Sequence, residues 1–185
     1  MKTITVFVLI LLWGQLIFAQ NKGIKADQLL IKNRSTGKSV KLFSSVETLK
    51  NFGELIEIKN DELAGIESDY AKSYIYADVI FYVSGRGMIS SFDISSPNIS
   101  LEIEGKFAIS IGNSMQEISK IFPNEVQTAH LIKFGQKNVA YLLVEIPCLF
   151  FNQFLKEDVI ADEALHLFFN PENKNLEKIY FWIRP

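Results

Sequence analysis

The stretch Phe107 to Pro123, FAISIGNSMQEISKIFP, combines a short alternating strand, a turn and an amphipathic helical pattern. A shift of 69 positions, without a gap, aligns it with the earlier stretch Ser39 to Phe52, SVKLFSSVETLKNF. The aligned pairs are Val40 with Ile109, Leu42 with Ile111, Ser45 with Ser114, Val46 with Met115, Leu49 with Ile118 and Phe52 with Ile121. This register predicts a duplicated architecture.

Each copy is expected to start a helix at a capped turn. Ser44 and Glu47 fit an S-x-x-E capping box, and Asn113 and Gln116 hold the matching positions of the second copy. Alternating apolar runs after each helix predict antiparallel strands. The predicted fold class is therefore α+β, with two tandem helix-plus-antiparallel-sheet units and the helices packed on one face of the sheet. A single, strongly bent sheet around an internal cavity is the competing fold.

The division of the chain follows from composition and turn signals. Residues 1–19 resemble an export signal, with Lys2 before an apolar run that is too short to span a bilayer. Residues 20–38 are expected to be a linker with one short strand, 39–96 the first repeat unit and 97–185 the second, with an insert at 148–163. We therefore expect a secreted or periplasmic protein without a membrane anchor after cleavage.

Charge and reactive side chains argue against several function classes. The chain has 19 basic and 21 acidic side chains, which gives no electrostatic reason to expect nucleic acid as a partner. Cys148 is the single cysteine and is expected in the core, although a nucleophile paired with His130 or His166 is the alternative. No cofactor motif is present, and the sequence predicts a protein that is not an enzyme.

Metal binding is also not expected. Acidic side chains gather in one loop, but their spacing matches no ordered ligand loop, so a solvated acidic loop is preferred to a calcium site. The side chains in question are Asp61, Glu62, Glu67 and Asp69.

Alternation within the expected hairpins separates two faces. The apolar face is predicted to contain Ile75, Ala77, Val79, Phe81 and Val83 in the first copy, and Leu165, Leu167, Phe169, Ile179, Phe181 and Ile183 in the second. The opposite, open face is rich in Tyr and Trp, which are enriched at binding hot spots. The candidate partner-binding residues on that face are Tyr74, Tyr76, Tyr82, Tyr141, His166, Tyr180, Trp182 and Arg184, with Asp78 and Glu145 beside them.

The insert at 148–163, CLFFNQFLKEDVIADE, has an aromatic side and a polar side. A short helix that covers a sheet edge is the preferred interpretation, and a binding lid is the alternative.

The line IGNSMQEISKIFP resembles the small outer-membrane lipoprotein family called SmpA/OmlA, or BamE-like, and through it the tandem-repeat β-lactamase inhibitory proteins. The resemblance rests on Ile111-Gly112, Ser114, Ile118, Ile121 and Pro123, and on the final FFNPENKNLEKIYFWI. In the first copy, Phe43 stands where the pattern has Gly112. The resemblance implies a helix-bearing antiparallel sheet, twice over, that acts by protein contact without a cofactor.

Together these patterns predict an exported, non-catalytic binding module that contacts another envelope or extracellular protein through the open face of its sheet. A small-molecule or carbohydrate-binding protein with an internal pocket is the first alternative, and a small secreted hydrolase is the second.

Overall fold

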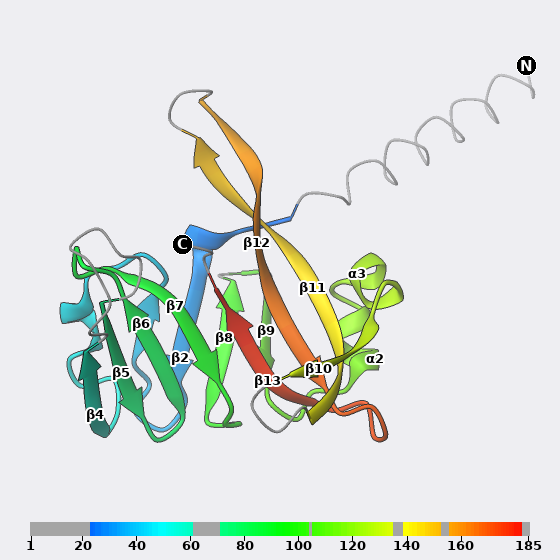
Figure 1. The fold of residues 1–185 in the computed structure, drawn as a ribbon, viewed down its shortest axis with the longest axis horizontal. Helices are drawn as coiled ribbons and strands as arrows, with labels where there is room; N and C mark the ends of the chain where they lie inside the picture. The colour runs from blue at the N-terminus through cyan, green and yellow to red at the C-terminus, as the bar shows by residue number, and fades with distance from the viewer. Residues whose placement is uncertain (1–22, 61–70, 104, 135–138, 153–155, 183–185) are drawn as a thin grey trace, which may run out of the picture.

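The computed structural model describes residues 23–60, 71–103, 105–134, 139–152 and 156–182, which form two layers of β-sheet (Figure 1). The larger sheet has nine strands among these residues, in the order β1-β11-β12-β13-β7-β6-β5-β4, with β10 also paired to β11. Its strands are β1 (Ile24–Lys25), β4 (Leu55–Asn60), β5 (Lys72–Tyr76), β6 (Val79–Val83), β7 (Ile89–Ile94), β10 (His130–Phe134), β11 (Val139–Asn152), β12 (Glu157–Phe169) and β13 (Leu176–Phe181).

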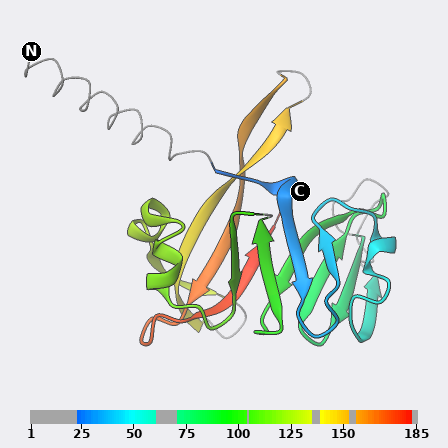
Figure 2. The ribbon, with the colours of Figure 1, turned by 180° about the vertical axis from the view of Figure 1, so that it is seen from behind.

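The smaller sheet lies behind the larger one, as the view from behind shows (Figure 2). Its order is β3-β2-β8-β9, from β2 (Leu29–Asn33), β3 (Ser39–Lys41), β8 (Ile99–Ile103) and β9 (Phe107–Ser110). Burial alternates along β2, because one side of each pleat faces the other sheet. Ile31 and Leu101 from this sheet, and Phe92 and Leu167 from the larger one, are fully buried in one core.

The order of elements occurs twice along the chain. The first set is β2, β3, the 3-10 helix η2 (Val46–Leu49) and the meander β4 to β7; the second is β8, β9, the helices α2 (Met115–Ser119) and α3 (Pro123–Gln127), and the meander β10 to β13. Antiparallel pairing of β2 with β8 joins the sets in the small sheet, and pairing of β7 with β13 joins them in the large sheet. The two sets therefore share one core.

The turn before each helix has the same local structure at the 69-residue offset. Phe43 and Gly112 both have positive φ, at 64° and 94°, and Ser45 and Ser114 are the two N-cap residues. The full capping box is Ser114 with Glu117, where the Ser114 hydroxyl accepts from the Glu117 N–H and the Glu117 carboxylate accepts from the Ser114 N–H. The predicted caps at Ser44 and Asn113 were wrong by one residue.

The predicted α+β fold class is wrong, because a second sheet covers the large sheet where helices were expected. The helical segments η2, α2 and α3 have only four or five residues each, too few to bury the face of a nine-stranded sheet. Strands were predicted at 39–43 and 101–111. The first is β3, the second is divided into β8 and β9, and all three belong to the covering layer. The resemblance to the BamE-like family fails for the same reason, since that family implied helices packed on a sheet.

The predicted short helix at 148–163 is also wrong. Strands β11 and β12 continue through this segment as a hairpin that projects beyond the sheet (Figure 1), after a register shift between Pro147 and Leu149. At its base, the Phe150 ring lies 5.8 Å from Phe43, and the Lys25 ammonium lies 2.6 Å from the Asp158 carboxylate.

Other predicted segments lie partly in the fold and partly outside the described residues. The expected linker contains β1, the 3-10 helix η1 (Ala26–Gln28) and β2, which is an interior strand of the small sheet. The export signal at 1–19 and the acidic loop at 61–69 lie outside the described residues. Within the described ranges, none of the helices has the length and apolar character needed to traverse a bilayer.

Candidate functional site

The candidate site is the outer face of the large sheet, on the side away from the small sheet. Four neighbouring strands place polar and aromatic side chains side by side there. In the strand register, Asp93 of β7 lies opposite Tyr180 of β13, Tyr180 opposite His166 of β12, and His166 opposite Glu145 of β11. Tyr82 of β6 lies opposite Ser91 of β7. Because these are direct cross-strand neighbours, their side chains share one face.

Ring contacts connect this face from β6 to β12. The Tyr82 and Trp182 rings meet edge to face with centroids 5.9 Å apart, and Trp182 stacks on Tyr180 at 5.8 Å with 25° between the planes. The Tyr180 ring lies 6.4 Å from His166. These separations fall in the range of attractive aromatic pairs, so each ring restricts its neighbour.

A second ring cluster continues the row toward β10. The Phe168 side chain is fully buried although it belongs to the outer face. Its ring lies 4.8 Å from Phe134 and 5.6 Å from Tyr141. The Phe134 ring of β10 also lies 6.2 Å from the Tyr180 ring of β13. Strands β11 and β12 lie between β10 and β13 in the sheet. The sheet therefore curls over its own outer face at β10. We call the whole row the aromatic strip: Tyr82, Trp182, Tyr180, His166, Phe168, Phe134 and Tyr141.

A partly buried ion pair lies beside the aromatic strip, on the same face of the sheet. The Lys178 ammonium is 2.6 Å from the Asp93 carboxylate, with the two side chains 23% and 14% exposed. The same ammonium lies 5.3 Å from the Phe134 ring centroid and 5.6 Å from that of Tyr180. Lys178 therefore ties β13 to β7 and to the curled strand β10.

Burial controls the protonation of the two acids in this region. It raises the pKa of the Asp93 carboxyl, and the hydrogen bond and positive charge of Lys178 act in the opposite direction. Burial also raises the pKa of the Tyr82 phenol, with a smaller contribution from the negative charge of Asp93. The Tyr82 hydroxyl thus stays protonated at neutral pH.

Cys148, the candidate nucleophile, does not lie beside His130 or His166, the two candidate bases. Cys148 is buried in the core, and burial raises its pKa to about 12. His166 lies on the outer face, with its Nε2 3.4 Å from the Glu145 carboxylate, so the sheet separates it from Cys148. His130 is exposed on β10. Within the described ranges, no group of three or more His, Cys, Asp or Glu side chains could hold a metal ion.

Two of the predicted site residues belong to the opposite face. Tyr76 is 7% exposed, its hydroxyl donates to the Leu49 carbonyl at 3.2 Å, and its ring packs on Phe52 and Phe81. Tyr74 lies opposite Phe81 and packs against the same core. The prediction treated 74–83 as one strand, but β5 ends at Tyr76 and β6 begins at Val79, and the turn between them inverts the alternation.

The remaining predicted residues are placed as follows. Tyr82, Tyr141, His166, Tyr180 and Trp182 lie on the outer face, and Arg184 lies outside the described residues. The Asp78 carboxylate, in the turn after β5, accepts from the Asn98 side chain at 3.3 Å.

Sequence reasoning missed Phe134, Phe168, Asp93 and Lys178. Phe169 was predicted in the core, so alternation along the strand would have placed its neighbour Phe168 on the outer face. Nothing in the sequence indicates that Phe134 returns over the sheet.

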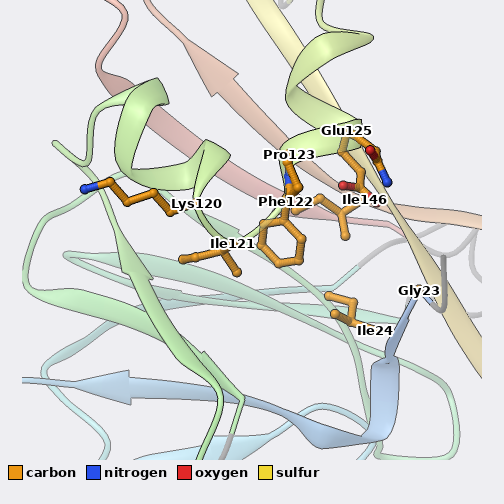
Figure 3. A pocket seen from close by; sticks show the side chains of 9 residues that line it. Gly23, Ile24, Lys120, Ile121, Phe122, Pro123, Glu125 and Ile146 are labelled. Atoms are coloured by element: carbon orange, nitrogen blue, oxygen red, sulfur yellow. The ribbon is translucent and has the colours of Figure 1, made fainter. Parts of the chain in front are cut away.

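A small hollow lies elsewhere, between the α2–α3 turn and the start of the described chain (Figure 3). Its volume is about 190 Å³, and Figure 3 shows the Phe122 ring directed toward Ile24 while the Lys120 ammonium points away. The other lining residues are Gly23, Ile121, Pro123, Asn124, Glu125 and Ile146. It shares no residue with the aromatic strip.

Comparison with known proteins identifies no relative: no family model, no curated protein and no solved structure matches the chain.

Proposed function

We propose that this protein is an exported, non-catalytic binding module whose aromatic strip contacts another envelope or extracellular protein. The observation that carries the proposal is the continuous row of rings on the outer face, from Tyr82 of β6 to Tyr141 of β11. Tyr and Trp provide large contact areas together with O–H and N–H donors, which is why they dominate binding hot spots.

The strip is also held in place before a partner arrives. Each ring packs against at least one other ring, and the Lys178 ammonium, paired with Asp93, lies 5.3 Å from the Phe134 ring centroid and 5.6 Å from that of Tyr180. Side chains that are already ordered lose little entropy on binding, and more of the contact energy then appears as affinity. A partner surface of complementary chemistry offers apolar and aromatic side chains that pack against these rings.

The rival function is carbohydrate binding by the same rings. A sugar stacks on an open ring face, but Tyr180 and Trp182 use one face of each ring against the other, and Tyr82 approaches Trp182 with its plane at 69°. The strip therefore offers edges as much as flat faces, which favours a protein partner. Export is supported by the apolar segment after Lys2.

The test is affinity capture from an envelope fraction with three versions of the protein, followed by calorimetry with each purified partner. The strip variant carries Tyr82→Ala and Trp182→Ala. The matched control carries Met88→Ala and Leu131→Ala, two exposed apolar residues outside the strip. Circular dichroism first establishes that both variants fold.

We expect the control to bind as the wild type does and the strip variant to bind at least about tenfold more weakly, as the loss of one hot spot implies. If the strip variant keeps every partner at wild-type affinity, the rings are structural and the proposal is wrong. If a glycan array captures the wild type and not the strip variant, carbohydrate binding replaces protein binding.

A further inference from the structure

Strand β4 ends the large sheet with a free, apolar edge. Among the described residues it pairs only with β5, and all six of its residues are exposed. Ile56 is 63% exposed and Ile58 45%, and Leu55 is exposed as well. The register with β5 shifts between Leu55 and Glu57, so Ile56 lies at an irregularity. A strand of this kind presents unpaired N–H and C=O groups beside apolar side chains, which other strands can pair with.

At the opposite end of the same sheet, other elements of the chain cover strand β11. There β10 and β1 pair with successive parts of β11, and α3 packs against β11. Within the described part of the first set, from β2 to β7, no element corresponds to α3 or β1. Instead, a hollow of about 270 Å³ remains between η2 and the strands β4 and β5, and Leu55, Tyr74 and Tyr76 line its sheet side. Among the described residues, the β4 end therefore lacks the cover that the β11 end has.

Alternation along β4 assigns its side chains to two faces. Ile58 lies opposite Tyr74 and shares the core side, whereas Glu57 and Lys59 lie opposite Ile75 and Ser73 on the outer side. The Glu57 and Lys59 side chains are 3.4 Å apart. The edge thus carries one acidic and one basic group, two residues apart, on the same face.

We propose that a second copy of this chain pairs its β4 antiparallel with β4, around a two-fold axis perpendicular to the sheet at Ile58. Such an axis keeps each face on its own side, so paired residues must share a face. With Ile58 opposite Ile58, each Glu57 lies opposite Lys59 of the second copy. A shift of the register that centres on Glu57 or on Lys59 instead places like charges opposite each other, which destabilises a strand pair.

The β10 edge of the same sheet does not offer this match. A two-fold pairing of β10 around Ile132 would place Leu131 opposite Lys133, and that edge also curls over the outer face. The β4 pairing joins two nine-stranded sheets into one and leaves both aromatic strips on the same side. A dimer therefore doubles the proposed contact surface without using any strip residue.

Charge reversal tests the pairing and its register together. Glu57→Lys and Lys59→Glu each place like charges opposite one another in a homodimer, while an equimolar mixture of the two variants restores opposite charges at every pair. The wild type, both variants and the mixture are compared by analytical ultracentrifugation over a wide range of protein concentration. The exchanged variant, with both substitutions, is the matched control because it preserves complementarity.

We expect a concentration-dependent dimer for the wild type, the mixture and the exchanged variant, and a dissociation constant at least about tenfold higher for each single variant. A wild type that remains monomeric overturns the proposal, as does a dimer that both single variants form at wild-type strength.

A disulfide provides the second readout. Residues directly opposite in antiparallel strands have Cα atoms about 4.5–5.5 Å apart, within the range of a disulfide. Ile58→Cys should therefore cross-link the dimer under mild oxidation, and Leu131→Cys on β10 should not. Equal cross-linking of the two variants would indicate random collision and contradict the pairing.

Discussion

Replacing Tyr76 by alanine should destabilise the protein by about 3–5 kcal/mol, the usual cost of removing a large aromatic side chain from a core. The side chain is 7% exposed, and its ring lies 5.7 Å from Phe52 and 5.9 Å from Phe81 in edge-to-face contacts. Its hydroxyl also donates to the Leu49 carbonyl at the end of η2. Tyr76→Phe keeps the ring and removes only this hydrogen bond, so it should cost about 1 kcal/mol.

Urea unfolding followed by circular dichroism measures both variants. Since a domain of this size is stable by roughly 5–15 kcal/mol, the alanine variant should unfold at a much lower urea midpoint with a similar m-value. Leu131→Ala is the control, because a change at a side chain that is 65% exposed should stay within about 0.5 kcal/mol. A loss below about 1 kcal/mol for Tyr76→Ala would place the side chain on an open face and refute the core assignment.

Two other predictions concern buried ionisable groups. Replacing Lys178 by methionine leaves the Asp93 carboxyl buried without its cation, so we expect a loss of about 3 kcal/mol at neutral pH and partial recovery when Asp93→Asn is added; an unchanged urea midpoint would contradict the role of the pair. Burial raises the pKa of Cys148 from 9.0 to about 12, so the stability due to the neutral thiol is complete below pH 9.0 and is lost as the pH rises through 12. At mildly alkaline pH, iodoacetamide should accordingly modify the folded protein far more slowly than the urea-unfolded protein, and equal rates would show that the thiol is accessible.

The face of each strand was predictable where a strong turn signal bounded the hairpin. The loop 170–175 is rich in Asn and contains Pro171, and the alternation on both sides correctly places Leu165, Leu167 and Phe169 in the core. His166, Tyr180 and Trp182 then fall on the outer face, where the ring contacts occur.

The same reasoning failed at 74–83 because the turn there has no Gly or Pro. In YIYADVIFYV the chain reverses at Ala77 and Asp78, and the register Tyr74 to Phe81 pairs even-numbered residues of β5 with odd-numbered residues of β6. When the chain reverses and the apolar alternation continues through the turn, the local sequence does not show the turn. Tyr74 and Tyr76 could therefore be assigned to the core only from the pairing of β5 with β6.

The sequence by itself determined the local features: a capped turn before each helix, although predicted at Ser44 and Asn113 instead of Ser45 and Ser114, and the alternation of the last hairpin. These depend on neighbours a few residues apart, and the side chains encode them directly. Only the tertiary structure decided which strands share a sheet. The pairings of β2 with β8 and of β7 with β13 join residues about 70 to 90 positions apart, and backbone hydrogen bonds between strands are nearly independent of side-chain identity. The second sheet and the single core shared by the two sets follow from these distant pairings.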